Sequence, residues 1–188
     1  MLKRLEEFGK HIAIAGFKNV KISDVENFLE TVRTKLKADV EFQFFDAKFV
    51  ATWQHLYFAS LNALTAFKNK ENISRSLAME IMLYASAQHQ IRRAMELIGI
   101  KPDSSEIAVL IIGKDAENVE SALSCIAEIV NAKRDDGVLM LSEEKIEAIQ
   151  KAFEISDVEI EAVKAKDALE KAIVDLVIER GALLAAQR

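Results

Sequence analysis

Apolar and polar residues alternate in several short segments of the chain, and this period of two predicts β-strands. In residues 39–47, Val40, Phe42 and Phe44 are separated by polar side chains. The run 106–113 is almost entirely hydrophobic, which is typical of a strand at the centre of a sheet. The predicted strands are residues 11–17, 39–47, 106–113 and 137–142.

Between these segments the apolar residues recur at helical spacing. Two "SDVE" tetrapeptides, at 23–26 and 156–159, have the form of a capping box, in which Ser and Glu satisfy free amides at a helix start. Gly99 and Pro102 end the longest helical pattern. The predicted helices are residues 25–37, 52–68, 72–100, 115–132, a short helix starting at 142–144, and a C-terminal helical segment from 156.

The segment 72–100, "NISRSLAMEIMLYASAQHQIRRAMELIGI", is long enough for one helix of seven turns. On a helical wheel, Leu77, Ile81 and Tyr84 begin an apolar stripe, and Gln88 falls at its centre. A buried amide is costly unless other polar groups meet it. The helix is therefore either buried from two directions or partly a binding surface.

The order of elements, β-α-β-α-α-β-α-β-α-α, predicts an α+β fold. We expect a single domain over residues 1–188, with a small mixed sheet of about four strands flanked by several helices and a helical C-terminal segment. One Pro and six Gly among 188 residues favour long, uninterrupted helices.

Composition limits the possible functions. The net charge of −5 excludes general nucleic-acid binding by the whole surface, so any RNA contact needs a local basic patch. A single cysteine, Cys125, excludes an internal disulfide framework. The N-terminus lacks the features of a secretory signal, and no run of about 18 apolar residues exists. These features predict a cytoplasmic protein without membrane contact.

The sequence contains no recognisable catalytic motif. No glycine-rich phosphate loop is present. His11, His55 and His89 are far apart in sequence, so they do not indicate a metal site. Cys125 lies in an apolar helical context that suits a structural thiol better than a nucleophile. We therefore expect no enzyme activity, no catalytic residue, no metal and no cofactor.

Hydrogen-bond donors gather in and before the second half of the segment 72–100. They include Ser86, His89, Gln90 and Arg93, with Arg75, Arg92, Lys68 and Lys70 nearby in sequence. One interpretation is an ordinary solvated helix end. The other is a donor-rich ledge for phosphates and 2′-hydroxyls of RNA.

The residues 55–101, "HLYFASLNALTAFKNKENISRSLAMEIMLYASAQHQIRRAMELIGIK", resemble the TPRKB-like family of kinase-binding accessory subunits of the KEOPS complex. That family carries a block close to "NISRSLxMEILLYASGQRQIxxAI". "GFKNVKISDVENFL", "ATWQHLYFA" and "ERGALLAA" are similar as well, so the resemblance covers nearly the whole chain. Ala87 stands at a usual Gly, and His89 replaces a usual Arg with a side chain largely neutral near pH 7.

The resemblance implies a non-catalytic subunit in the synthesis of threonylcarbamoyl-adenosine in tRNA. Its partners would be the small atypical kinase/ATPase subunit of the complex and the single-stranded 3′ end of tRNA. Mapped onto this chain, the tRNA-binding residues would be Arg75, Ser86, Gln90 and Arg93, followed by Lys68, Lys70, Asn72 and His89. Gln88, Glu80 and His55 would be structural polar residues inside the fold.

The C-terminal segment has apolar residues around almost its full circumference, which predicts either a central helix of the domain or a protein interface. The candidate kinase-binding residues are Leu169, Ile173, Leu176, Val177, Leu183 and Leu184. Two alternative functions remain: a regulator that docks on the kinase without touching RNA, and an unrelated small cytosolic enzyme.

Overall fold

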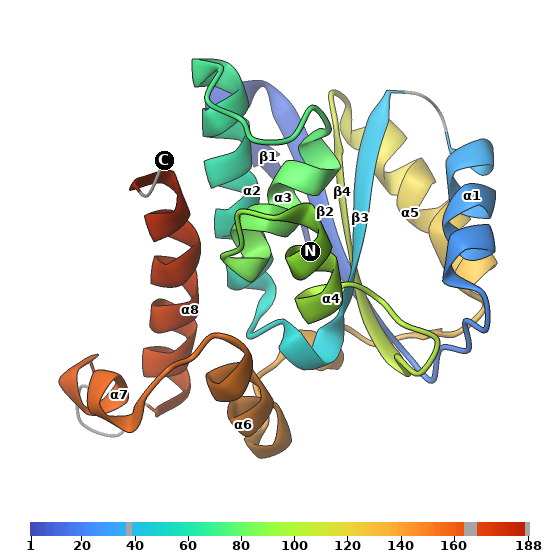
Figure 1. Cartoon of the computed structure of the whole chain (residues 1–188). Coiled ribbons are helices and arrows are strands. Elements are labelled where there is room, and N and C mark those ends of the chain that lie inside the picture. Colours follow the sequence, from blue (N-terminus) through green and yellow to red (C-terminus); the bar gives the residue numbers. More distant parts are fainter. Residues whose placement is uncertain (37–38, 164–168, 187–188) are drawn as a thin grey trace. The chain divides into compact units, whose positions relative to one another are not determined.

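The computed structural model describes residues 1–36, 39–163 and 169–186 (Figure 1). Its helices and single β-sheet confirm the predicted α+β class. By internal contacts the chain divides into two compact units. Unit 1 comprises Met1–Ala47 and Ile100–Val138, and unit 2 comprises Lys48–Gly99 and Leu139–Arg188. Lys37, the predicted end of the first helix, lies outside the described residues.

Unit 1 contains the sheet, whose strand order is β1-β2-β4-β3, with β5 pairing to β2. Every pairing is antiparallel, so the prediction of a mixed sheet is wrong. The sequence also missed β1, which is short and mostly exposed. The strands are β1 (Leu2–Leu5), β2 (Lys10–Lys18), β3 (Val40–Asp46), β4 (Glu106–Gly113) and β5 (Lys133–Arg134); a 3₁₀ turn, η1 (Glu6–Phe8), joins β1 to β2.

Two helices, α1 (Val25–Lys35) and α5 (Ala116–Val130), lie on one face of this sheet (Figure 1). Phe44 of β3 packs there against Phe28 of α1, with ring centroids 5.1 Å apart. Every residue of β4 from Ile107 to Gly113 is buried, and β4 pairs with β2 and β3, which confirms the central strand predicted from its continuous hydrophobic run.

The two "SDVE" segments start helices in different ways. At the second, Ser156 and Glu159 form the predicted reciprocal box: each side chain accepts from the other's backbone N–H, at 2.9 and 3.3 Å. At the first, Asp24 is the N-cap, and its carboxylate accepts from the Asn27 N–H at 2.9 Å. The prediction that Ser23 caps this helix is therefore wrong.

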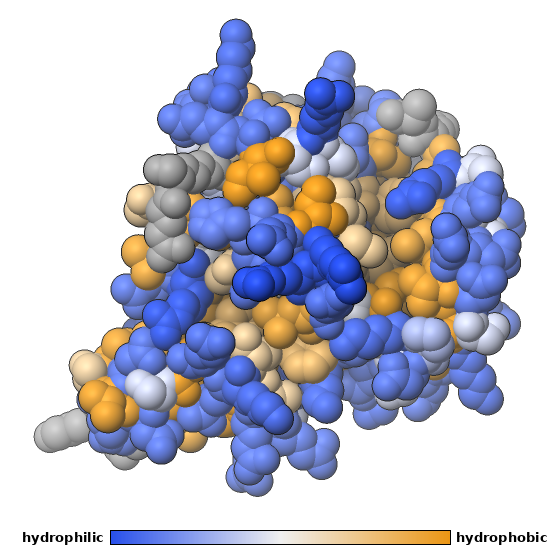
Figure 2. All heavy atoms as spheres, in the orientation of Figure 1, coloured by the Kyte–Doolittle hydropathy of each residue, from blue (hydrophilic) through white to orange (hydrophobic). Residues whose placement is uncertain are grey.

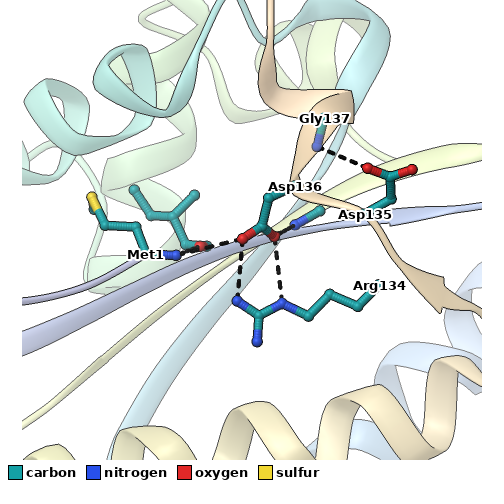
Figure 3. Close-up of polar contacts among 7 residues, drawn as sticks. Met1, Arg134, Asp135, Asp136 and Gly137 are labelled. Carbon is teal, nitrogen blue, oxygen red and sulfur yellow. Dashed lines mark hydrogen bonds and ion pairs between the residues drawn. The ribbon is translucent and has the colours of Figure 1, made fainter.

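The prediction of a fourth strand at residues 137–142 is also wrong. The chain there forms a 3₁₀ helix, η3 (Asp136–Leu139), because the Asp136 carboxylate holds it against β2 (Figure 3). That carboxylate accepts from the Gly16 N–H at 3.0 Å and from the Arg134 guanidinium at 3.2 Å. It also lies 3.8 Å from the Met1 amino nitrogen, which donates to the Ile14 carbonyl.

In the part of unit 2 that the structure describes, all regular elements are helices. α2 packs against α3, and α8 packs against both of them, while α4 packs on α3. The helices are η2 (Ala47–Phe49), α2 (Trp53–Asn69), α3 (Leu77–Ser86), α4 (Ile91–Ile98), α6 (Glu143–Ala152), α7 (Asp157–Val163) and α8 (Leu169–Ala186). Within the described ranges, every helix is too short or too polar to cross a bilayer.

The single seven-turn helix predicted over 72–100 is two helices separated by a turn. Ala87 has φ 52°, a left-handed conformation that ends α3. The Ala87 N–H donates to the Tyr84 carbonyl at 3.3 Å, and the Gln88 N–H donates to the Leu83 carbonyl at 3.1 Å. This pair of bonds is a Schellman motif. Residues 87–90 are called the α3–α4 turn below.

Candidate nucleic-acid and partner interfaces

The residues predicted to bind tRNA form two groups at opposite ends of α3. The α2–α3 cluster comprises Lys68, Lys70, Asn72 and Arg75, which lie around the connection that precedes α3. The α3–α4 cluster comprises His89, Gln90 and Arg93, which lie in and after the turn that follows α3. The ten residues of α3 separate them by about 15 Å along the helix axis. The structure therefore does not join them into one continuous ledge.

Ser86 belongs to neither group, because it is fully buried in the last turn of α3. Its hydroxyl donates to the Leu83 carbonyl at 3.1 Å. The prediction that Ser86 offers an exposed donor is therefore wrong. The helical wheel misplaced it because α3 is covered on all sides from Glu80 to Ser86.

In the α2–α3 cluster, two side chains shape the connection itself. The buried Glu80 carboxylate accepts from the backbone N–H groups of Ile73, at 3.0 Å, and Ser74, at 2.7 Å. The half-buried Asn72 amide donates to the Ser74 carbonyl at 2.9 Å. Glu80 thus lies inside the fold, as an internal partner of the loop, and Asn72 turns its donor inward. Lys68, Lys70 and Arg75 remain exposed on this connection.

In the α3–α4 cluster, His89, Gln90 and Arg93 are exposed, and among the described residues their side chains make no hydrogen bond or ion pair. Gln90 is the N-cap of α4 but does not cap it with its side chain. Strongly hydrophilic residues cover this part of the surface in Figure 2. The neighbouring Arg92 is engaged by Glu96 at 2.9 Å. Exposed donors without a partner among the described residues therefore lie at this turn, as Lys70 and Arg75 do at the other end of α3.

Gln88 differs from its prediction. It lies half-buried in the turn rather than in the middle of a helix, and its backbone N–H, not its side-chain amide, supports the fold. Within the described parts of the chain, its amide forms no hydrogen bond. The costly buried amide inferred from the helical wheel does not exist, because the wheel assumed a continuous helix.

Ala87→Gly is expected to stabilise the protein by about 1 kcal/mol. A left-handed alanine costs about 1–2 kcal/mol, and this relief exceeds the extra backbone entropy of glycine in the unfolded chain. Chemical denaturation measures the change. The matched variant Ala78→Gly, in the regular part of α3, should instead destabilise by about 1 kcal/mol. Destabilisation by both variants would contradict the left-handed turn.

His55 is buried in α2 with 2% of its surface exposed, and it lies beneath the end of α3. Its Nε2 is 2.7 Å from the Ala85 carbonyl, and its Nδ1 accepts from the Ala51 N–H at 3.4 Å. Burial, opposed by the hydrogen bond to the Ala85 carbonyl and helped by the nearby Lys145 ammonium, lowers the pKa of His55 to about 4. The His55 imidazole is therefore neutral inside the fold at neutral pH.

Most of the predicted kinase-binding residues are not on the surface. α8 packs on α2 and α3 through its apolar side, and the side chains there are almost fully buried. These are Ile173, Leu176, Val177 and Leu184. The prediction that they are available for docking is wrong, because they form the core of unit 2. Leu169 and Leu183, each 39% exposed, stay accessible.

An exposed apolar surface nevertheless remains at the end of α8. Residues 181–186, "GALLAA", carry no charge, and four of these six residues are exposed. Ile178, one turn before Ala182, is half-buried and lines a small crevice with Phe58 of α2, which is 42% exposed. The α8-end surface is defined as Phe58, Ile178, Ala182, Leu183, Ala185 and Ala186. Figure 2 shows apolar residues interrupting the hydrophilic surface beside α8.

Comparison with known families gives these surfaces a context. The chain matches the family described as "Kinase binding protein CGI-121" over residues 17–184. The chain belongs to the CGI-121 family. The match includes elements of both units, both polar clusters and α8 as far as Leu184.

Two relatives show the range of the CGI-121 family. "Regulatory protein Cgi121" of Methanocaldococcus jannaschii is 34% identical over 116 residues, which cover 62% of this chain and 72% of the relative. "EKC/KEOPS complex subunit CGI121" of Candida glabrata is 28% identical over 138 residues, which cover 68% of this chain and 75% of the relative. The names of both relatives describe regulation or assembly.

The part of this CGI-121 chain that the structure describes gathers no three His, Cys, Asp or Glu side chains in an arrangement that could hold a metal ion. Cys125 is half-buried on α5. The sequence missed Phe58 as a surface residue. The sequence did contain a sign of this: Phe58 is an aromatic residue of α2 that lies outside the helix's apolar stripe. That sign could be interpreted only once the packing of α8 beside it was known.

Proposed function

We propose that this chain is a non-catalytic, cytoplasmic subunit of a KEOPS-like complex that makes threonylcarbamoyl-adenosine in tRNA. It binds the small atypical kinase/ATPase subunit and helps to hold tRNA by its 3′ end. The observation that carries the proposal is the CGI-121 match over residues 17–184. The Candida glabrata relative, named as a subunit of the EKC/KEOPS complex, supports the assembly.

The α8-end surface is the proposed docking site for the kinase subunit. Its side chains are apolar and exposed at the end of a helix whose other side is packed in unit 2. Apolar groups left in this state are stabilised by a partner that removes them from water. The absence of charge from residues 181–186 suits the centre of a protein interface, where charged residues are depleted.

The two polar clusters are the proposed contacts for tRNA. Arginine and lysine bind phosphates, and amide side chains bind sugars and base edges of unpaired nucleotides. The separation of about 15 Å along α3 suits two contacts spaced along a single strand better than one compact pocket. The α3–α4 cluster carries the stronger expectation, because all three of its side chains lack a partner among the described residues, whereas Asn72 of the α2–α3 cluster donates to the Ser74 carbonyl.

Arg93→Glu is expected to weaken tRNA binding about tenfold, because a charge that attracts phosphate becomes one that repels it. Filter binding at several salt concentrations measures this, and the log–log salt slope should fall by roughly 0.7 for each lost phosphate contact on a single strand. Arg33→Glu, the same charge change at an exposed position of α1 in unit 1, is the matched control and should bind normally.

The location of the site would be contradicted by equal losses in Arg93→Glu and Arg33→Glu. The preference for the 3′ end would be contradicted if tRNA lacking its single-stranded 3′ tail bound as well as intact tRNA. The tail is therefore removed in a parallel titration with the wild-type chain.

A second candidate function is regulation of the kinase by docking alone. The net charge of −5 and the division of the basic residues between two ends of α3 favour it. Under this alternative, the isolated chain shows no saturable tRNA binding at any salt concentration, yet still changes the rate of ATP hydrolysis by the kinase subunit.

A further inference from the structure

The α3–α4 turn is formed against the local preference of the sequence. Apolar spacing over 72–100 fits an uninterrupted helix, and no glycine or proline lies between Asn72 and Ile98. The residue that breaks the helix is Ala87, whose β-carbon disfavours the left-handed conformation it adopts. Such a conformation persists only when surrounding contacts hold it. A tertiary contact at the end of α3, added to the turn's own hydrogen bonds, would therefore favour the broken helix.

The carbonyl groups at the end of α3 show which contact does so. The last carbonyls of a helix have no partner within it. The turn's own N–H groups take the Leu83 and Tyr84 carbonyls, and His55 takes the Ala85 carbonyl at 2.7 Å. In an uninterrupted helix, that carbonyl would instead accept from the N–H of His89, four residues later. The imidazole thus replaces the bond that a continuous helix would form.

The imidazole is held in the orientation that this bond requires. Nδ1 accepts from the Ala51 N–H, so the proton of the neutral ring lies on Nε2, which then donates to Ala85. The ring packs edge-on against Phe153, with centroids 5.6 Å apart. Its burial excludes water as a substitute donor. His55 therefore offers the Ala85 carbonyl a buried donor in a fixed orientation.

We propose that His55 is the positioning residue of the α3–α4 turn: by holding the Ala85 carbonyl it keeps the helix broken at Ala87 and presents Gln90 and Arg93 on the surface. The expected effect of His55 on tRNA binding rests on the proposed function. Its effect on the conformation of the turn does not. If the helix continued through the turn, every residue after Ala87 would change direction relative to α3. The donors of the α3–α4 cluster would then no longer share their present surface.

Two substitutions of His55 distinguish the two hydrogen bonds that its ring makes. In asparagine, the side-chain amide lies as many bonds from Cα as Nδ1 does, so His55→Asn can keep the Ala51 bond and loses the Ala85 bond. In glutamine, the amide lies as many bonds from Cα as Nε2 does, so His55→Gln can keep the Ala85 bond and loses the Ala51 bond. Both variants lose the same ring packing against Phe153, which makes them a matched pair.

Hydrogen exchange of the His89 amide in the full chain is the primary measurement. In the turn this N–H has no backbone acceptor among the described residues, whereas in a continuous helix it would bond to the Ala85 carbonyl. His55→Asn should therefore raise its protection at least about tenfold, the factor expected for one gained hydrogen bond, and His55→Gln should keep it close to wild type. Adding Ala87→Gly to His55→Asn should return the exchange rate to that of wild type, because glycine adopts the left-handed conformation without the help of His55.

Binding of tRNA and kinase is the second measurement. His55→Asn should weaken tRNA binding about five- to tenfold and leave kinase binding unchanged, whereas His55→Gln should leave both near wild type. Equal behaviour of the two variants at the His89 amide, including unfolding of both, would overturn the proposal, because His55 would then be an ordinary core residue. If the wild-type chain binds no tRNA, the RNA part of the proposed function fails, while amide exchange still decides the role of His55.

Discussion

Leu176→Arg is expected to destabilise the protein by at least about 4 kcal/mol. Leu176 is 4% exposed in α8, on the side that packs against α2 and α3. An arginine there would bury an unpaired charge or force α8 away from its neighbours, and either outcome is among the most costly single substitutions. The melting temperature should fall by about 10 °C or more.

Ala182→Arg is the matched variant on the exposed side of the same helix. Arginine is a good helix former, so the melting temperature should stay near that of wild type. Binding to the kinase subunit should weaken at least about tenfold, since a charge would enter the α8-end surface. Ser121→Arg, at an exposed position of α5 in unit 1, should change neither property.

These variants separate a core role of α8 from an interface role. Normal melting of Leu176→Arg would contradict the packing of α8. Normal kinase binding by Ala182→Arg would contradict the placement of the docking site at the end of that helix, without affecting the packing.

The protein should lose about 3 kcal/mol of stability as the pH falls from 6.5 to 4. Burial, with the Lys145 ammonium, lowers the pKa of His55 from 6.5 in the unfolded chain to about 4 in the folded one. Between these values the unfolded state binds more protons, so stability is complete above pH 6.5 and decreases as the pH falls. The difference of about 2.5 units corresponds to about 3 kcal/mol.

Chemical denaturation at intervals between pH 7 and 4.5 measures this slope. His55→Gln removes the titrating group and should flatten the curve over that range. The Glu159 carboxylate, whose pKa is lowered to about 2 by hydrogen bonds from Ser156 and Arg180, contributes only below about pH 4.5. An unchanged slope in His55→Gln would contradict the buried, neutral imidazole.

The sequence predicted those elements whose pattern is decided locally. The strand 106–113 and the helix from 52 to about 68 were found because their apolar spacing and their burial agree. The capping box at Ser156 was found because both partners lie within four residues. The antiparallel order of the sheet was not predictable, because strand pairing depends on contacts distant in sequence.

The break at Ala87 was missed because alanine gives no local signal for it, although the Gly usual at this position in the resembled family is a helix-end signal. The His55 contact lies some thirty residues earlier in the chain. This error misplaced Gln88, whose position was read from a continuous wheel, whereas Ser86 was misplaced because α3 is buried on all sides around it. The buried side of α8 was misread for a related reason: a helix apolar on most sides fits a core as well as an interface, and only the packing of α2 and α3 decides.

Affinity purification of the full chain from its native cells tests most directly whether this is a binding subunit. We predict that a small kinase-like ATPase and tRNA co-purify with it, that raised salt removes the tRNA before the kinase, and that the chain alone turns over no nucleotide. Recovery of neither partner, or conversion of a substrate by the isolated chain, would contradict the proposed function.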